Sequence, residues 1–534
     1  MKTAYFNGKV YTGDLPLAEA FVVENDKFIF AGTTEKARKL ADTEIDLEGK
    51  FVCAGFNDSH MHLLNYGYSL IMAPVNMHTG SLEDMINCLK EYHAENPNGI
   101  NGWILGRGWN QDYFADVSRM PNRWDLDNVT TEMPVCAVRC CGHALSVNSK
   151  ALEILGITAE TPQVPGGEIV MENGEPNGVF LDNAMDMVYT AIPAPTKEDV
   201  KNMIRAACKA LNSYGVTSSQ SDDYCVFRNL PWQTVNEAYT ELENTGELTV
   251  RVYEQANFTN VKGLSDFVDA GNITGKGSDN FKIGPLKMLG DGALGAHTAF
   301  LSRPYADAPE TCGIPVFTQK TFDEMISFAN KNNMQCAIHA IGDGCLDRVL
   351  AAVEKALDEK PRANHRHGIV HCQITRPDQL EKIAALKLHV YAQSIFLDYD
   401  IQIVESRVGK ELADTSYSWK TLLSRGATVS NGTDCPVELP FALGGIQCAV
   451  TRRTLKGGEA YLPQEAFTVK EALDSYTASG AYASFEENEK GRIEAGMVAD
   501  FVVLSQNPFE VSPDRISEIQ VLETFMGGNK VFGA

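Results

Sequence analysis

The sequence predicts an α/β protein whose main domain is a (β/α)8 barrel, the TIM-barrel fold. Short β-rich runs alternate with helix-length segments through the middle of the chain, which is typical of a parallel sheet. Short strands separated by turn residues occupy both ends, and a long stretch after the first barrel strand interrupts the alternation. We therefore expect a composite β-sandwich domain built from both termini and an insertion that follows the first barrel strand.

The predicted barrel strands are apolar runs such as "LTVRVYEQANF", "MQCAIHAIGD", "LHVYAQSI" and "ATVSNGTDCP". Counting an opening strand at Phe51, about eight such runs occur, which is the number a closed barrel needs. Helices are expected between them, for example over residues 321–332, 345–359 and 376–386. The barrel domain is predicted to span residues 54–486.

The two ends of the chain resemble each other in pattern. "EAFVVENDKFIFAG" near the start and "GRIEAGMVADFVVLSQNP" near the end alternate apolar and polar residues between turns, as short antiparallel strands do. We expect residues 1–53 and 487–534 to form one small β-sandwich. The insertion is predicted at about residues 68–195, where Gly- and Pro-rich pieces such as "PQVPGGEIVMENGEPNG" break the alternation.

Composition narrows the class of protein. The formal net charge of −24 and pI near 4.9 repel a phosphate backbone, so nucleic acid is not an expected partner. No run of about 18 apolar residues is present, so no membrane partner is expected either. The 13 cysteines are scattered, mostly in apolar runs, as reduced thiols are in a cytoplasmic protein. We expect a cytoplasmic location and a small-molecule substrate.

The stretch "AGFNDSHMHLL" ends an apolar run with two histidines one residue apart. In an extended strand, side chains at positions i and i+2 point to the same face, so His60 and His62 would aim at one point. Two convergent neutral imidazoles suit a borderline divalent cation. An isolated His-x-His can also be a pair of ordinary loop residues, so the metal hypothesis needs further ligands.

Those ligands are found where later predicted strands end. Lys287 lies near the end of one strand, and His339, His371 and Asp434 lie at the ends of three others. The C-terminal ends of barrel strands converge on one mouth, where catalytic groups sit. Four imidazoles and one carboxylate around one point make a good metal cage.

Each of these residues also has an ordinary structural explanation. His339 and His371 could be core histidines, Asp434 could be a turn residue, and Lys287 could pair with a carboxylate. The set is less expected by chance, because all its members share one position within their strand–helix unit. Glycine clusters such as "GDGALG" lack a full phosphate-binding pattern and are interpreted as turns.

The motifs "GFNDSHMHL", "KMLGDGALGAHTAFLSRPY", "AIHAIGDG", "GTDCPVE" and "GRIEAGMVADFVVL" resemble the amidohydrolase superfamily, and within it the amidohydrolase 3 branch that holds N-substituted formamide deformylase. The resemblance covers nearly the whole chain and is not specific for a substrate. It implies a metal-dependent hydrolase of carbon–nitrogen bonds other than peptide bonds, such as N-formyl or N-acyl amides. It also suggests a homodimer.

The resemblance implies a set of site residues. One or two divalent metal ions, usually Zn²⁺, would be held by His60, His62, Lys287, His339, His371 and Asp434. Lys287 matches the position that carbon dioxide converts to a bridging carbamate. Asp434 would move the proton from the attacking water to the departing nitrogen, as general base and then general acid.

Other residues are candidates for the substrate. His143, in "RCCGHALSVNS", is a candidate donor to the substrate carbonyl, or a loop histidine. Arg139 could anchor an anionic group or form an internal salt bridge, and Trp109 could line the pocket or lie in a core. Gln393 lies near a strand end, as a substrate-contacting or ligand-supporting group. His297 replaces the arginine usual in the branch, which points to a different substrate or a tolerated surface change.

Two other functions use the same residues. A deaminase or a cyclic-amide hydrolase could employ the same metal cage with a different pocket. A non-catalytic sensor or regulator could keep the fold, although it would have little need for the proton-transferring Asp434.

Overall fold

The structure is a computed structural model that describes residues 1–140, 144–164, 166–227 and 229–533. The chain divides into two compact units. The barrel unit comprises Met1–Leu64, Ala207–Val226 and Tyr239–Ala534, and the inserted unit comprises Asn65–Ala206 and Phe227–Ala238.

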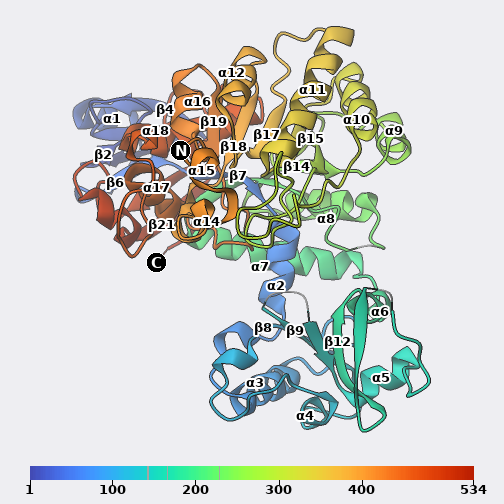
Figure 1. Cartoon of the computed structure of the whole chain (residues 1–534). Coiled ribbons are helices and arrows are strands. Elements are labelled where there is room, and N and C mark those ends of the chain that lie inside the picture. Colours follow the sequence, from blue (N-terminus) through green and yellow to red (C-terminus); the bar gives the residue numbers. More distant parts are fainter. Residues whose placement is uncertain (141–143, 165, 228, 534) are drawn as a thin grey trace. The chain divides into compact units, whose positions relative to one another are not determined.

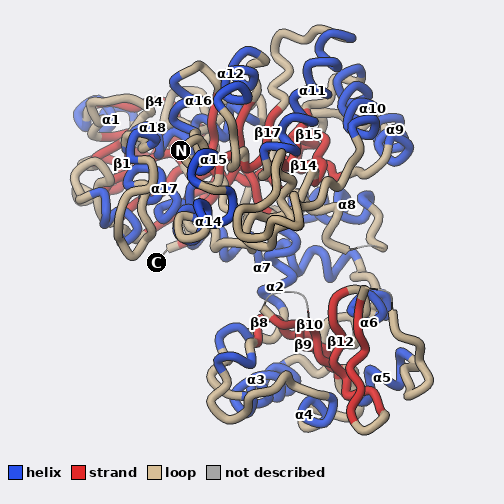
Figure 2. The backbone as a smooth tube through the Cα atoms, viewed as in Figure 1, coloured by secondary structure: helices blue, strands red, loops and turns tan. Residues whose placement is uncertain are grey.

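Eight parallel strands form the central sheet of the barrel unit, and Figures 1 and 2 show them enclosed by helices. In spatial order they are β7 (Phe56–Met61), β13 (Val216–Ser221), β14 (Arg251–Asn257), β15 (Phe281–Leu289), β16 (Cys336–Ala340), β17 (Gly368–His371), β18 (His389–Ala392) and β19 (Thr428–Asn431). Spatial order follows sequence order, as the alternation of strands and helices predicts. The predicted α/β barrel is confirmed.

The first barrel strand differs from the prediction. The strand that begins at Phe51 is β6 (Phe51–Ala54), which pairs with β2 (Lys9–Val10) and β20 (Phe501–Leu504) in a terminal sheet. The barrel opens instead with β7, two residues later, after Gly55. A Cβ at Gly55 would stand 2.2 Å from the Thr217 hydroxyl oxygen, so only glycine fits where the chain passes from one sheet to the next. A continuous apolar run hides this break from sequence periodicity.

The last strand returns to the first and nearly closes the barrel. Just beyond β19, the Asp434 amide donates to the His60 carbonyl over 2.8 Å, and the His62 amide donates to the Cys435 carbonyl over 2.7 Å. The buried Asp58 carboxylate accepts hydrogen bonds from the Thr433 amide at 3.0 Å and the Thr433 hydroxyl at 2.5 Å. These bonds hold Asp434 beside the His-x-His motif.

Figure 1 shows helices α10, α11 and α12 outside the barrel strands. The helices of this unit are α1 (Thr34–Leu40), α9 (Val261–Asp269), α10 (Gln319–Lys331), α11 (Asp343–Glu359), α12 (Pro377–Ala385), α13 (Leu397–Asp400), α14 (Val404–Val408), α15 (Lys410–Ala413), α16 (Trp419–Ser424), α17 (Ala442–Thr451), α18 (Val469–Ser475) and α19 (Ala478–Ala483). The three predicted helices agree with α10, α11 and α12 to within two residues at each end. Local signals set these ends: Thr318 caps α10, and Pro377 starts α12.

Two small mixed sheets come from the termini. One contains β4 (Lys27–Gly32), β3 (Ala20–Glu24), β1 (Lys2–Phe6) and β5 (Thr43–Asp46), and the other contains β2 (Lys9–Val10), β6, β20 (Phe501–Leu504), β21 (Val521–Met526) and β22 (Asn529–Phe532). The pairs β1–β5 and β2–β6 are parallel, so these sheets are not purely antiparallel. An aromatic core joins both ends of the chain, with Phe501 and Phe525 stacked at 4.3 Å.

The inserted unit is built around a five-stranded sheet of its own. Its order is β11 (Gly167–Glu172), β12 (Glu175–Asp182), β10 (Ala144–Val147), β9 (Val135–Arg139) and β8 (Ile104–Trp109). Its helices are α3 (Leu82–Glu95), α4 (Arg123–Asp127), α5 (Ser149–Leu155) and α6 (Met185–Ala191). Helices α2 (Leu63–Ile71), α7 (Lys197–Ser213) and α8 (Trp232–Asn244) cross the residue boundaries of the two units.

No helix in the described ranges is long and apolar enough to cross a bilayer. The cytoplasmic location and the homodimer stay predictions.

Candidate metal centre

The two histidines of the His-x-His motif are oriented by hydrogen bonds on one side of each ring. His60 Nδ1 lies 2.9 Å from Gln255 Oε1 on β14, and His62 Nδ1 lies 3.1 Å from the Asp222 backbone carbonyl. A carbonyl oxygen only accepts, so each Nδ1 carries the proton and donates it. Each Nε2 atom is then left with a lone pair, which is the form that binds a metal ion.

Asp434 completes this half of the site. Its Oδ1 lies 3.2 Å from His60 Nε2 and 3.1 Å from His62 Nε2. This oxygen is buried and accepts no hydrogen bond from any residue of the described ranges. Three lone-pair atoms at this spacing repel one another unless a cation lies between them. Tetrahedral ligands with bonds of about 2.0–2.1 Å lie roughly 3.3 Å apart, so the arrangement fits a divalent metal ion.

The second pair of histidines has the same design. His371 Nδ1 lies 2.7 Å from Gln393 Oε1, and His339 Nε2 lies 3.1 Å from Asp291 Oδ1 and 3.2 Å from the Gly292 carbonyl. The free nitrogens, His371 Nε2 and His339 Nδ1, face each other at 3.0 Å. Donor atoms of His60, His371 and Asp434 lie within 4.8 Å of one another, so the two halves form one cluster.

Lys287 lies between these groups. Its side chain is completely buried, and its Nζ is 3.3 Å from His60 Nε2 and 3.3 Å from Asp222 Oδ2. Asn257 also donates to Asp222 Oδ2, over 3.1 Å. The structure thus brings all six predicted ligands together, and it adds Asp222 as a carboxylate beside Lys287.

Electrostatics favour the ligand form of two histidines. Burial, together with Lys287, lowers the pKa of His60 to about 4. Burial and the neighbouring His339 hold the pKa of His371 well below its usual value. Burial also lowers the pKa of His62, but the Asp434 and Asp222 carboxylates outweigh it and raise that pKa. A neutral imidazole binds metal without first losing a proton.

Sequence reasoning missed two residues that support the ligands, Gln255 and Asp222. Both touch the site through contacts between residues far apart in the chain, and neither stands in a recognisable motif. Phe396 was also missed, and its ring stacks on His371 with centroids 5.9 Å apart and planes 17° apart. A second group of possible donors, His62, Asp222 and Cys225, lies nearby, but there His62 Nδ1 is already used to donate to the Asp222 carbonyl.

The comparisons with known proteins place this geometry in a family. Residues 43–532 match the amidohydrolase family. The chain is 32% identical to YtcJ of Bacillus subtilis (strain 168), over 100% of this chain and 99% of that protein.

The chain belongs to the amidohydrolase family.

Two further relatives carry informative names. An uncharacterised metal-dependent hydrolase of Pyrococcus furiosus has a solved structure with a TM-score of 0.79 and 30% identity, covering 96% of this chain and 100% of that chain. The N-substituted formamide deformylase of Arthrobacter pascens is 26% identical, over 96% of this chain and 94% of that protein. The predicted family is confirmed.

The predicted substrate residues of this amidohydrolase have a different outcome. Trp109 is fully buried in the core of the inserted unit, where its indole donates to the Ala137 carbonyl over 2.9 Å, so it does not line a pocket. Arg139 bonds to the side chains of Asn110, Gln111 and Asp112. This is the internal salt bridge that was the alternative to an anchor for the substrate.

Three more predicted substrate residues are His297, Gln393 and His143. His297 Nε2 lies 3.0 Å from Asp307 Oδ1, within hydrogen-bond distance, and both side chains are partly exposed. Gln393 has no exposed surface and supports His371, so it is not placed to touch a substrate. His143 lies outside the described residues.

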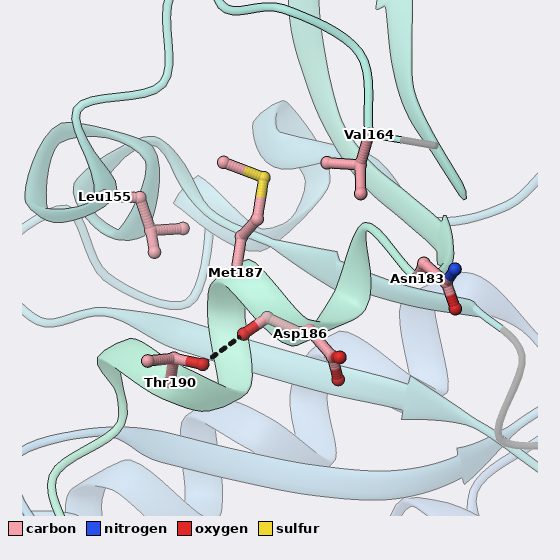
Figure 3. Close-up of a pocket in the computed structure, with 6 residues that line it drawn as sticks. All are labelled: Leu155, Val164, Asn183, Asp186, Met187 and Thr190. Carbon is pink, nitrogen blue, oxygen red and sulfur yellow. Dashed lines mark hydrogen bonds between the residues drawn. The ribbon is translucent and has the colours of Figure 1, made fainter. Parts of the chain in front are cut away.

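The inserted unit has an open hollow of about 640 Å³ that the sequence analysis did not predict. Figure 3 shows its lining, with Leu155, Val164 and Met187 as apolar walls and with the Thr190 hydroxyl donating to the Asp186 carbonyl over 2.7 Å. None of the predicted site residues lines this hollow, so it is not the metal centre.

Proposed function

We propose that this amidohydrolase hydrolyses an amide-type carbon–nitrogen bond in a small molecule, such as an N-formyl or N-acyl amide. The observation that carries the proposal is the position of Asp434. Its buried Oδ1 accepts no hydrogen bond and lies 3.1–3.2 Å from two imidazole nitrogens, at the mouth of the barrel. A carboxylate held beside ligand atoms in this way is placed to exchange a proton with a reacting water.

The donor set suits one or two divalent ions, with Zn²⁺ as the proposed metal, because imidazole and carboxylate ligands match a borderline cation. His60, His62 and Asp434 would hold one ion, and His339 and His371 the other. When bound, the metal supplies Lewis-acid activation of water and of the substrate carbonyl. Gln255, Asp222 and Gln393 keep the imidazoles in the ligating tautomer through the bonds described above.

Asp434 carries the proton transfers in this proposal. Water adds its oxygen to the amide carbon and gives a proton to the Asp434 carboxylate. When the carbon–nitrogen bond breaks, Asp434 returns that proton to the departing nitrogen. The products are a carboxylic acid and an amine, and Asp434 is ready for another cycle.

Lys287 is proposed to react with carbon dioxide and form a carbamate. Its nitrogen bonds to the carbon of CO₂ and releases a proton to solvent, which converts an amine into an anionic bidentate ligand. The burial of Nζ beside His60 supports this role. The Asp222 carboxylate stabilises the protonated amine of Lys287 and would repel an anionic carbamate. We therefore expect the carbamate to form together with metal uptake, because the positive metal ion offsets this repulsion.

The test compares the wild-type protein with Asp434→Asn on a panel of N-alkyl and N-aryl formamides and acetamides, with amine release as the readout. We expect wild-type turnover and a loss of about 10²–10⁴-fold or more in kcat for Asp434→Asn with its metal retained. Asp266→Asn removes an exposed carboxylate of α9 in the same unit, which pairs with Lys262, and serves as the matched control. Equal turnover by Asp434→Asn and the wild type would refute the role of Asp434.

The same panel includes cyclic amides and aminopurines. Activity confined to these compounds would favour a cyclic-amide hydrolase or a deaminase.

A further inference from the structure

Exposed apolar side chains of the barrel unit gather where strands end. After residue 45, every exposed large apolar side chain in the described part of this unit lies at the end of β15 or follows β15, β18 or β19. They are Leu289, Ile314, Val316, Tyr399, Val437 and Leu439, with 37–65% of their surface exposed. Contiguous exposed apolar surface on a protein marks a place where a ligand or partner binds.

Several of these side chains lie within one or two contacts of the metal-site residues. Leu289 stands two positions after Lys287 on β15, so both side chains point to the inner face, with Leu289 nearer the mouth. The Val437 amide donates to the Asp434 carbonyl over 2.9 Å, and the Val316 amide donates to the Gly290 carbonyl over 3.0 Å. The half-buried Phe396 adds its ring beside His371.

Two arginines of this unit that lie near the apolar rim are already paired with carboxylates. Arg407 pairs with Asp307, and Arg303 pairs with Glu411 at 2.8 Å. On the same side of the barrel, Glu438 follows Val437, and burial with the nearby Asp398 and Asp400 raises the pKa of Glu438 to about 7. The electrostatic surroundings of the rim are therefore acidic.

We propose that the mouth of this amidohydrolase binds an uncharged, apolar substituent of the substrate amide and discriminates against substrates with a free carboxylate beside the amide. The inference rests on the proposed amide hydrolysis and specifies its substrate class. Leu289, Val316, Val437 and Phe396 gain contact with the substituent and lose water. A carboxylate placed there would lose its hydration and meet Glu438, while Arg407 and Arg303 are already paired with Asp307 and Glu411.

The test uses N-formylphenylalanine and its primary amide, which have nearly the same shape and differ by one negative charge. Wild-type protein loaded with zinc is expected to show kcat/KM for the neutral amide at least about tenfold above that for the carboxylate. N-(2-phenylethyl)formamide should likewise exceed N-methylformamide by about tenfold or more, because only the larger substituent reaches the apolar rim.

Val437→Lys places a cation at the rim. It should reduce the ratio of kcat/KM for the neutral amide to kcat/KM for the carboxylate at least about threefold. Leu40→Lys adds the same charge at an exposed apolar position of α1 and serves as the matched control, with an unchanged ratio. Calorimetric titration of both compounds into the zinc-loaded protein gives the same ratio as a difference in Kd, without need of turnover.

The outcomes separate the two proposals. Tighter binding of the neutral amide without hydrolysis of either compound would refute the amide hydrolysis and support the selectivity. Equal or better binding and turnover of the carboxylate would overturn the selectivity and leave the amide hydrolysis standing.

Discussion

At the scale of single residues, the hydrogen bond on one side of each imidazole decides which nitrogen the metal site receives. His60 and His371 both donate from Nδ1 to a glutamine side-chain oxygen, over 2.9 Å and 2.7 Å. Both glutamines, Gln255 and Gln393, are buried and have their amide nitrogens bonded to backbone carbonyls, so their oxygens are fixed toward the rings. The tautomer is thus set before any metal arrives.

Gln393→Leu removes the acceptor behind His371 and tests this arrangement. We expect about 10–100-fold weaker metal affinity, because the ring loses its fixed orientation and tautomer. Competition with a chromogenic chelator measures the affinity. Gln335→Leu, which removes a buried glutamine just before β16, is the control for general destabilisation and should leave metal affinity nearly unchanged. Equal affinities for Gln393→Leu and the wild type would contradict the account.

The position of a residue at a strand end could be predicted from sequence, and its partners across the barrel could not. The predicted ligands belong to one cluster because each follows or ends a barrel strand, and these strand ends meet at the same mouth of the barrel. They include His60, His62, Lys287, His339 and His371. The Gln255 contact joins residues 195 positions apart and leaves no local pattern. Trp109 and Arg139 were candidates by residue type, and their own unit supplies their partners.

At the scale of elements, strands β18 and β19 are linked by a buried histidine. His389 has no exposed surface, and its two ring nitrogens lie 2.7 Å from the Thr428 hydroxyl and 2.8 Å from the Ser430 hydroxyl. Burial, aided by Arg366, lowers the pKa of His389 to about 3. In the unfolded chain the same group has a pKa of about 6.5.

The protein is therefore expected to lose stability as the pH falls below about 6.5. The unfolded state then binds a proton at His389, whereas the folded state does not bind it until the pH falls to about 3. Between pH 7.5 and 4.5 this one group costs about 2–3 kcal/mol of unfolding free energy. Denaturant titrations of wild-type and His389→Gln proteins measure the pH slope. The same slope in both proteins would show that His389 does not titrate as described.

The strand–helix alternation predicted the barrel strands, and the terminal sheets were predicted only in outline. β6 and β7 lie in one apolar run, yet they belong to different sheets, and Gly55 between them leaves the room that the Thr217 side chain occupies. The parallel pairing of β1 with β5 also could not be predicted, since pairing depends on contacts beyond the local pattern.

At the scale of the whole molecule, the C-terminal end of the chain is tied to the barrel. Arg251 on β14 donates to Asp500 beside β20, with its Nε 2.6 Å and a terminal guanidinium nitrogen 3.1 Å from the two carboxylate oxygens. Both side chains are at least nine-tenths buried. The Gly527 amide donates to the same carboxylate over 2.7 Å, so one buried ion pair connects a barrel strand with the C-terminal sheet.

Arg251→Leu leaves Asp500 buried and unpaired, and we expect a loss of about 3–5 kcal/mol in unfolding free energy. The double variant Arg251→Leu/Asp500→Leu removes both charges and should recover part of that loss. Denaturant unfolding of the three proteins measures both effects. A double variant no more stable than Arg251→Leu would show that the ion pair is not the source of the destabilisation.

The metal content of the whole chain tests the central claim most directly. Elemental mass spectrometry is applied to protein purified without chelators and without a histidine tag. We expect about one to two equivalents of a divalent transition metal per chain, most of it zinc. Protein that holds no metal, even after incubation with zinc and bicarbonate, would contradict the metal centre and every role derived from it.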